Sequence, residues 1–407
     1  MRAALMPLDD ALAELLAHVR PLPGSDEVST FDADGRVLAQ AVVSALQVPP
    51  QDNSSMDGYA VRSVDVPRAG TALRVTQRIP AGASGSAVQP GCAARIFTGA
   101  PIPPGADAVV MQEDCATGAD ASDLRVDRVP QPGQWIRRAG EDVTLGATVL
   151  APGQRLSPAE LGLAASVGMA TLKVQRQPRV ALFSTGDELV MPGEVAPAAM
   201  PPGAIYNSNR FFLRSLLVRL GCVVTDMGIV PDQRAATVEA LRSAALTHDV
   251  ILTSGGVSVG EEDHVKPAVA ELGRLDLWQI AIKPGKPFAS GRIGEAHFLG
   301  LPGNPVSSFV TFLLLVRPFI LSLMGVQRVA APGMQLRADF DWPRADRRRE
   351  FLRVRRNPQG GVDLFPNQSS GVLTSVVWAD GIVDNPPGQT IARGDAVRFM
   401  ALSDLLN

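Results

Sequence analysis

The 407-residue chain is poor in cysteine, lysine, histidine and tyrosine, and it carries little net charge. Its three cysteines are far apart in the sequence and form no CxxC pair. This argues against a structural zinc site and fits a reducing compartment. A formal net charge of −3 argues against a general nucleic-acid binder, because such proteins need a large surplus of basic residues.

The sequence also lacks a long uninterrupted hydrophobic run. The apolar segment 8–19 is broken by three acidic residues, which is not the pattern of a secretory signal peptide. The most apolar stretch, residues 309–316, stops at Arg317, well short of the roughly 20 residues that a membrane span needs. We therefore expect a cytoplasmic protein that binds neither a membrane nor nucleic acid.

Four segments are predicted from the local patterns. They are a flanking α+β subdomain (1–45 and 147–177), an inserted all-β domain (46–146), an α/β doubly wound domain (178–327) and a C-terminal β-barrel or β-sandwich (328–407). Within the flanking subdomain, Ser157 and Glu160 have the spacing of a helix capping box.

The α/β domain is predicted from alternating strands and helices joined by short links. Strands are expected at 179–184, 222–230, 249–254, 275–282 and 296–300, and helices at 209–220, 232–247, 262–272 and 305–323. Asp232 would be the N-cap of the second helix. Such alternation predicts a mostly parallel sheet that is covered on both faces.

In a sheet of this kind, ligands bind beyond the carboxyl ends of the strands. The third strand is followed by a glycine-rich loop that offers backbone and hydroxyl donors to phosphate oxygens through Ser254, Gly255, Gly256, Ser258 and Gly260. A tight turn without a ligand would explain the glycines equally well.

Carboxylates follow the same strand ends. Glu188, Asp232 and Asp263 would repel a phosphate unless a divalent cation lay between them, and Mg²⁺ is commonly held by one or two carboxylates together with phosphate oxygens. Taken singly, each of the three acids could be a surface residue or a helix cap.

Lysine is concentrated in one loop. Two of the four lysines of the chain, Lys283 and Lys286, lie within six residues, where a compact ammonium group would neutralise an anion. The loop at Pro302, Asn304 and Pro305 opens a long helix and offers a second anion-binding N-terminus.

At this point the residues resemble a known family. The matching segments are 55–60, 97–101, 140–143, 184–189, 254–260, 283–288 and 301–306, and their order along the chain is more specific than any one of them. The chain resembles the molybdopterin molybdenumtransferases, bacterial proteins of the MoeA family that are related to the E domain of gephyrin.

The resemblance implies a reaction. The family takes adenylylated molybdopterin and molybdate, cleaves the phosphoanhydride with the help of Mg²⁺, releases AMP and leaves molybdenum on the pterin dithiolene. It also implies an elongated homodimer with the active cleft between the subunits, and possible contacts with the molybdopterin adenylyltransferase and with molybdoenzyme chaperones.

The resemblance also assigns residues. Asp57, Thr98, Asp142, Glu188, Asp232 and Asp263 match catalytic positions, and the last three would hold the metal. The glycine-rich loop, both lysines and the 302–305 loop would bind substrate, together with Ser370 and Ser375, which would come from the partner subunit. The basic run 344–356 could face substrate phosphates, but a solvated strand face is the simpler interpretation.

Two departures from the family pattern stand out. Gln279 occupies a position where relatives often have lysine, which would remove one cation from the anion site. Asn207 occupies a position where they often have aspartate, which would be neutral in effect. Two other functions remain open from the sequence: an adenylyltransferase that makes the activated pterin, and a scaffold that carries the finished cofactor.

Overall fold

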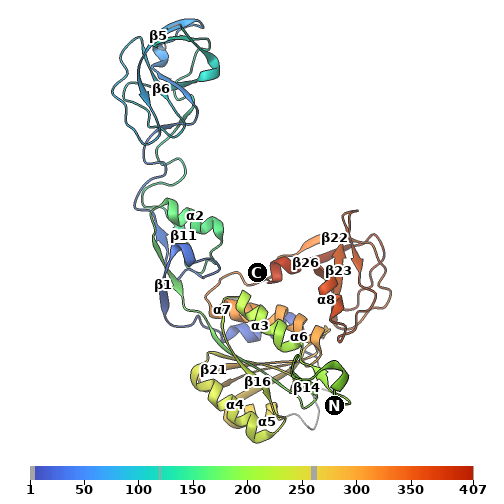
Figure 1. The fold of residues 1–407 in the computed structure, drawn as a ribbon. Helices are drawn as coiled ribbons and strands as arrows, with labels where there is room; N and C mark the ends of the chain where they lie inside the picture. Colours follow the sequence, from blue (N-terminus) through green and yellow to red (C-terminus); the bar gives the residue numbers. More distant parts are fainter. Residues whose placement is uncertain (1–4, 119, 121, 258–263, 407) are drawn as a thin grey trace.

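The computed structural model describes residues 5–118, 120, 122–257 and 264–406. Figure 1 shows an α/β layer at one end of the molecule, a β-barrel beside it, and a slender arm that carries a small β module at the other end.

A six-stranded sheet forms the centre of the α/β layer. Its order is β16 (Val223–Val230), β13 (Arg179–Thr185), β17 (Val250–Ser254), β21 (Ala296–Leu301), β20 (Pro287–Ile293) and β18 (Arg274–Gln279). Only β20 runs against its two neighbours in this sheet, so the other five strands share one direction. The predicted parallel arrangement is therefore confirmed for these five, while β20 was missed. The doubly wound fold class is also confirmed.

Helices cover both faces of the sheet, as expected. One face packs against α1 (Leu8–Ala17), α3 (Asn209–Arg219), α6 (Pro305–Thr311) and α7 (Arg317–Leu323), and the other against α4 (Arg234–Thr247) and α5 (Val265–Leu272). Side chains alternate along β13: Val180 and Leu182 enter the first core, whereas Ala181 and Phe183 enter the second. Burial on both faces explains the continuous apolar run of this strand.

The helix that follows β21 runs from Pro305 to Leu323 and contains a π-helical turn at Phe312–Val316. The wide turn ends two residues before Pro318, which has no N–H to donate to the preceding turn. Among the described residues this is the one helix long and apolar enough to cross a membrane, but 89% of its most apolar window is buried inside the fold. Arg317 fits in this core because its guanidinium donates to the carbonyl oxygens of Val329 (3.2 Å) and Asp404 (3.1 Å).

Two helix starts were predicted from capping patterns. The capping box is confirmed at α2 (Pro158–Ser166), where the Ser157 hydroxyl accepts from Ala159 N and the Glu160 carboxylate accepts from Ser157 N. The second prediction is wrong: α4 begins at Arg234 after Gln233, and no side chain caps it. Asp232 therefore does not cap this helix.

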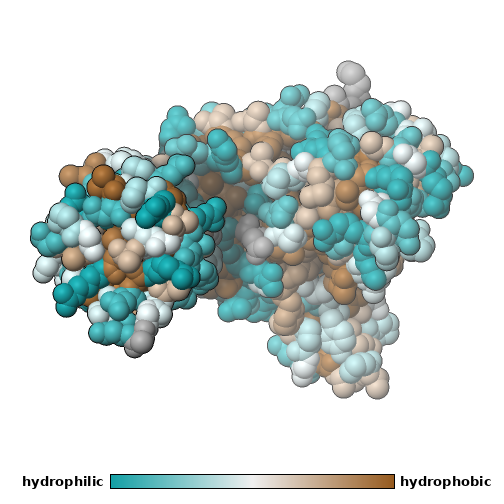
Figure 2. Space-filling view, turned by 90° about the horizontal axis from the view of Figure 1, so that it is seen from above, coloured by the Kyte–Doolittle hydropathy of each residue, from teal (hydrophilic) through white to brown (hydrophobic). Residues whose placement is uncertain are grey.

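The arm begins with short strand pairs, β1 (Ser25–Ser29) with β12 (Thr171–Gln175) and β2 (Val42–Val43) with β11 (Thr148–Leu150). Beyond them lies the distal module, residues 53–137. Its sheet has the order β7 (Ala108–Met111), β4 (Gly58–Val61), β6 (Cys92–Ile96), β5 (Thr71–Ile79), β9 (Asp123–Val126) and β8 (Cys115–Thr117), and β3 (Asn53–Ser54) pairs with β10 (Ile136–Arg137). Figure 2 shows this module at the left as a separate lobe with a mixed, mainly hydrophilic surface.

The C-terminal strands form a closed five-stranded barrel, as predicted. Its order is β23 (Arg349–Arg356), β24 (Gly361–Leu364), β22 (Met334–Ala338), β26 (Ala396–Ala401) and β25 (Gly381–Asn385), and a β23–β25 pairing closes the ring. The two-residue strand β19 (Ile282–Lys283) leaves the α/β layer and pairs with the start of β23. The barrel is therefore joined to the α/β layer through the lysine loop.

Candidate functional site

A cleft with a volume of about 690 Å³ lies at the carboxyl ends of the parallel strands, between the α/β layer and the barrel. It is lined by seven segments of the chain: the ends of β13, β16 and β17, the lysine loop, the start of α6, the residue before β23 and one loop of the barrel. The lining residues are Thr185, Gly186, Glu188, Asp232, Gly255, Gly256, Val257, Lys283, Pro284, Gly285, Lys286, Pro287, Pro302, Gly303, Asn304, Ser307, Arg348, Gln368, Ser369 and Ser370.

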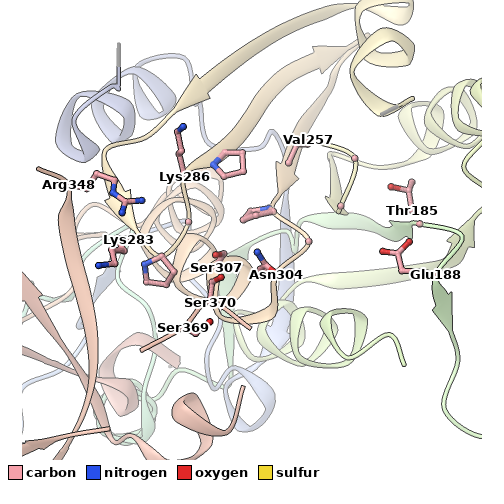
Figure 3. A pocket seen from close by; sticks show the side chains of 18 of the residues that line it. Thr185, Glu188, Val257, Lys283, Lys286, Asn304, Ser307, Arg348, Ser369 and Ser370 are labelled. Atoms are coloured by element: carbon pink, nitrogen blue, oxygen red, sulfur yellow. The ribbon is translucent and has the colours of Figure 1, made fainter. Parts of the chain in front are cut away.

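The cleft is electrically polarised along its length. In Figure 3, Lys283, Lys286 and Arg348 lie on one side, and Glu188 lies on the other side next to Thr185. Asn304, Ser307, Ser369 and Ser370 fill the space between them with neutral hydrogen-bonding groups. One end is thus suited to an anion, and the other to a ligand that arrives with a cation.

The glycine-rich loop needs its glycines for steric reasons. Gly255 (φ 94°) and Gly256 (φ 68°) both occupy the left-handed region, which side chains disfavour. A Cβ on Gly255 would lie 2.8 Å from the carbonyl oxygen of Thr185, and one on Gly256 would lie 2.3 Å from the Val265 side chain. The loop is therefore packed closely between β13 and α5.

Asn209 connects two of the loops that form the cleft. Its side-chain Nδ2 donates to Ser254 Oγ (2.8 Å), at the end of β17, and to the carbonyl oxygen of Gly303 (2.7 Å), before α6. Gly255 N also donates to the Leu301 carbonyl oxygen at 3.0 Å. Asn209 is only 8% exposed, so it acts as a fixed link between the phosphate-type loop and the 302–305 loop.

Lys283 is held by carboxylates from the barrel. Its Nζ lies 2.9 Å from Glu350 Oε1 and 3.5 Å from Asp346 Oδ2, and 5.7 Å from the centre of the Trp342 ring. Glu350 is 1% exposed and also accepts from the Trp342 indole N–H at 2.7 Å. The ammonium position is thus set from behind, while 39% of the Lys283 side chain remains exposed.

Arg348 is oriented in a similar way. Its Nε and Nη2 donate to the two carboxylate oxygens of Asp346 at 3.0 and 2.8 Å, and its backbone N donates to the same group. These bonds from Arg348 hold the pKa of Asp346 well below its usual range, while Asp346 raises the pKa of the Arg348 guanidinium. Both groups remain charged at neutral pH.

Lys286 differs from Lys283, because it is exposed and no ion pair holds it in the described part of the chain. It also lines an adjoining cavity of about 580 Å³, together with Gln279, Arg347 and Arg349. Gln279 therefore faces this adjoining cavity and is absent from the lining of the main cleft. Asn207, the other departure, is buried and accepts from Arg210 N at 3.2 Å at the start of α3.

Glu188 and Asp232 both line the acidic end of the cleft, close to the glycine-rich loop. The Glu188 carboxylate folds back over Gly186, where a Cβ would lie 2.5 Å from its Oε2. Within the described ranges, no three Asp, Glu, His or Cys side chains converge as a complete metal site. Two carboxylates beside a phosphate loop nevertheless fit the hard, oxygen-rich donor set of Mg²⁺, which takes its remaining ligands from phosphate and water.

The three catalytic residues predicted in the arm, two aspartates and one threonine, lie far from this cleft. Asp57 and Thr98 belong to the distal module, and Asp142 lies at its base, at the other end of the molecule from the α/β layer (Figure 1). Thr98 donates to Asp57 Oδ1 through both its backbone N and its hydroxyl, each at 2.8 Å. These bonds lower the pKa of the exposed Asp57 carboxyl, which therefore presents a fixed negative charge.

The remaining predicted residues divide into three groups. Ser370 lines the cleft beside lysines of its own chain, so the partner subunit is not needed to bring it there. Ser254, Pro305 and Ser375 are absent from the lining; Ser254 is bonded to Asn209, and Ser375 is fully buried in the barrel. Ser258, Gly260 and Asp263 lie outside the described residues.

Several cleft residues were not singled out from the sequence. Arg348, Gln368 and Ser369 come from the barrel, and the interpretation of 344–356 as a solvated strand face is wrong for its buried or ion-paired members. Ser307 lies one turn into α6, and Asn209 acts from behind the lining. The only signal in the sequence was the density of arginine in that basic run.

Known proteins match most of the chain. Residues 6–168 match the model of the MoeA N-terminal region (domains I and II), residues 181–322 a probable molybdopterin-binding domain, and residues 335–402 the MoeA C-terminal region (domain IV). A molybdopterin molybdenumtransferase of Haemophilus influenzae is 43% identical over 386 residues, which cover 94% of this chain and 93% of the relative. Molybdopterin molybdenumtransferase 2 of Mycobacterium tuberculosis is 37% identical, covering 92% and 93% of the two chains.

Solved structures agree. The molybdopterin biosynthesis MoeA protein of Pyrococcus horikoshii superposes with a TM-score of 0.85 at 28% identity, over 98% of this chain and 100% of that one. A second structure of the protein from that organism gives a TM-score of 0.77 at 31% identity, over 98% and 99%. With three family regions in order and a relative that is 43% identical over 93% of its own length, the chain belongs to the MoeA family of molybdopterin molybdenumtransferases.

Proposed function

We propose that this chain inserts molybdate into adenylylated molybdopterin and releases AMP, as the last step that places molybdenum on the pterin. The observation that supports this most directly is the polarised cleft, in which three cations face a carboxylate and a glycine-rich loop across a row of neutral donors. Such a cleft can hold a free oxyanion and a phosphorylated ligand at the same time.

Molybdate would occupy the cationic end. Lys283 is positioned there by Glu350, Arg348 is positioned by Asp346, and the exposed Lys286 can move to follow the ligand. Tetrahedral oxyanions accept hydrogen bonds from several directions, and Ser369 and Ser370, in the middle of the cleft, supply neutral donors next to this end. Together these groups would orient molybdate toward the middle of the cleft.

The adenylylated pterin would extend to the acidic end. Backbone N–H groups around Gly255 and Gly256 would cradle its phosphates, because the absence of side chains allows close approach. Glu188 and Asp232 would hold Mg²⁺ there, with Asp263 as a third ligand; when bound, this ion stabilises negative charge on the phosphate oxygens. Water or a molybdate oxygen would attack the adenylyl phosphorus, so that one new P–O bond forms, the P–O bond to the bridging oxygen breaks, and the pterin keeps its own phosphate. AMP would leave with the attacking oxygen, and the two dithiolene sulfurs would bind molybdenum in place of oxygens of molybdate, which leave as water.

The distal module would act on a second copy of the chain. Asp57 and Thr98 are too far from their own cleft to touch its ligand, and Thr98 keeps the Asp57 carboxylate charged and fixed. In a homodimer, these residues and Asp142 would complete the cleft of the partner subunit. The adenylyltransferase that makes the activated pterin and the chaperones that receive the product are the expected protein partners, in the cytoplasm.

The deciding experiment supplies purified protein with adenylylated molybdopterin, Mg²⁺ and molybdate, and measures AMP by chromatography. AMP release that depends on molybdate supports the proposal, and no release under these conditions contradicts it. ATP with molybdopterin but without molybdate tests the adenylyltransferase alternative, which predicts formation of the adenylylated pterin. A scaffold that only carries cofactor would bind the product and release no AMP.

A further inference from the structure

A second cavity, with a volume of about 300 Å³, lies between the central sheet and the helices α1 and α7. Its lining includes Arg274 at the start of β18 and His297 near the start of β21, whereas the cleft lies where the parallel strands end. The two spaces share no lining residue. This cavity is therefore a separate place in the fold, and no step of the proposed reaction uses it.

Aromatic rings line this cavity. Trp278 is 9% exposed, and its ring stacks on that of Phe288 with 5.9 Å between the ring centroids. The His297 ring meets the ring of Phe319, on α7, edge to face with 5.0 Å between the centroids. Leu15 of α1 adds apolar surface. These contacts hold the rings in place, so a flat molecule can pack against them without reorganising the wall.

The strand register places three polar side chains on one face of the sheet. Ser290 on β20 is paired with Leu299 on β21, two residues beyond His297. Trp278 is paired with Phe288, two residues before Ser290. Cross-strand partners share a face of a sheet, and so do alternate residues of one strand. Trp278, Ser290 and His297 thus point to the same side, where α1 and α7 cover the sheet.

None of these three side chains has a hydrogen-bond partner among the residues that the structure describes. Ser290 is 8% exposed, so its hydroxyl, like the indole N–H of Trp278, is largely withdrawn from bulk water. Their polar atoms are nevertheless not sealed inside the fold, and a small molecule in the cavity can reach them. Buried donors and acceptors in native proteins are almost always paired. A ligand in this cavity would supply the missing partners.

Both arginines that line the cavity are already paired. Arg274 Nη2 lies 2.9 Å from Asp276 Oδ2. Arg292 Nη2 donates to the carbonyl oxygen of Glu295 at 3.0 Å and lies 3.4 Å from its Oε2. Burial lowers the pKa of His297 to about 4, so its imidazole is uncharged at neutral pH and offers one donor and one acceptor. The cavity therefore presents neutral donors and acceptors, unlike the cationic end of the cleft.

We propose that this cavity binds an uncharged, planar heterocycle of the purine type. Such a molecule has two flat faces for the aromatic wall, and its rim of ring nitrogens and amino groups can pair with Trp278, Ser290 and His297. The volume lies at the lower end of the range for ligand pockets, about 300–1,000 Å³, which suits a free base better than a nucleotide. Both arginines are engaged, which likewise disfavours a phosphate group.

The test measures the binding of radiolabelled adenine to the full-length protein by equilibrium dialysis. Ser290→Ala removes one hydroxyl, and His297→Phe keeps a ring at the wall but removes both ring nitrogens. Ser243→Ala is the matched control, because Ser243 is exposed on α4, which covers the other face of the sheet. Unlabelled indole, a bicycle of similar size with one N–H and no acceptor nitrogen, competes with adenine in a parallel series. Thermal midpoints show whether each variant is folded.

The wild-type protein should bind adenine saturably, with a dissociation constant on the order of 0.1 mM for so small a ligand. Ser290→Ala and His297→Phe should each weaken binding about fivefold, because each removes a hydrogen bond to the ligand. Ser243→Ala should change the dissociation constant less than about twofold. Indole should compete at least about tenfold more weakly than unlabelled adenine, because it lacks the acceptors.

Three outcomes would overturn the inference. The first is the absence of saturable adenine binding to the wild-type protein. The second is binding that Ser290→Ala and His297→Phe both leave unchanged, which would place the adenine elsewhere. The third is indole that competes as well as adenine, which would show that the polar groups select nothing. If His297→Phe does not fold, Ser290→Ala decides. AMP release is no readout of this test, so failure of the proposed function would leave its result intact.

Discussion

Replacing either lysine of the cleft by glutamine removes one positive charge, but the two substitutions should differ in their effect on folding stability. Lys286 is exposed and unpaired among the described residues, so Lys286→Gln should change the free energy of unfolding by less than about 0.5 kcal/mol. Lys283 is paired with Glu350, which is 1% exposed. Breaking a buried ion pair costs about 3–5 kcal/mol, and partial exposure of Lys283 reduces our expectation to about 2 kcal/mol.

Both substitutions should weaken the binding of molybdate by a similar amount, because each removes one positive charge from the same end of the cleft. A unit charge at about 4 Å contributes about 4 kcal/mol at an effective dielectric constant of 20. Solvent around the open end of the cleft reduces this to about 2 kcal/mol per negative charge engaged, or roughly a 30-fold increase in KM for molybdate.

The assay combines the KM for molybdate in AMP release with urea unfolding of the same preparations. We expect the affinity for molybdate to fall in both variants, and the folding stability to fall only in Lys283→Gln. Equal losses of stability would show that the pairing with Glu350 has no energetic role. An unchanged KM in Lys286→Gln would remove that lysine from the anion site.

Three further predictions concern the link between loops, the pH dependence of stability and the arm. Asn209→Ala should lower kcat at least tenfold with a stability loss of about 2 kcal/mol, because it removes the donors to Ser254 and Gly303; unchanged kinetics would show that the two loops are positioned independently. Burial lowers the pKa of His297 to about 4, below its unfolded value of about 6.5, so its contribution to stability is lost as pH falls from 6.5 towards 4. In His297→Gln, the loss of unfolding free energy between pH 6.5 and pH 4, measured with urea, should therefore be smaller by at most about 3 kcal/mol. Asp57→Asn should leave the thermal midpoint unchanged and abolish most AMP release, and mixing it with a variant defective in the cleft should restore activity, whereas no recovery in mixed dimers would argue against a site shared between two chains.

The arrangement of the cleft could be predicted largely because parallel strands place their carboxyl ends at one edge. This rule alone brought together Glu188, Asp232, Gly255 and the lysine loop, which lie far apart in the sequence. The missed strand β20 did not disturb it. Because β20 runs against its neighbours, it begins at the same edge where β18 ends, and the lysine loop remains there.

The barrel contribution could not be predicted in the same way. Arg348 and Arg353 belong to one basic run, yet the first lines the cleft and the second is buried behind it. Arg348 directly precedes β23, whereas Arg353 lies within it, and what packs against each side chain cannot be read from local patterning. The same reasoning explains Ser375, whose short side chain is used by Arg353 and does not reach the cleft.

Capping was predictable only where two partners reinforce each other. Ser157 and Glu160 satisfy each other's backbone groups, so the capping box at α2 follows from four consecutive residues. A single aspartate before a helix has competing uses. Asp232 precedes α4 by two residues and lines the cleft. Its backbone N–H donates to Asp187 Oδ1 at 3.2 Å.

The pairing of β19 with β23 couples the position of Lys283 to the orientation of the barrel. Lys283 belongs both to the loop that leaves the α/β layer and to a strand that completes a barrel ladder, with Ile282 opposite Arg349 and Lys283 opposite Glu350. A rotation of the barrel against the α/β layer would therefore pull on the ammonium group itself. The affinity for the oxyanion would then depend on the orientation of the barrel relative to the α/β layer. By the same linkage, bound molybdate would stabilise the orientation in which it binds most tightly.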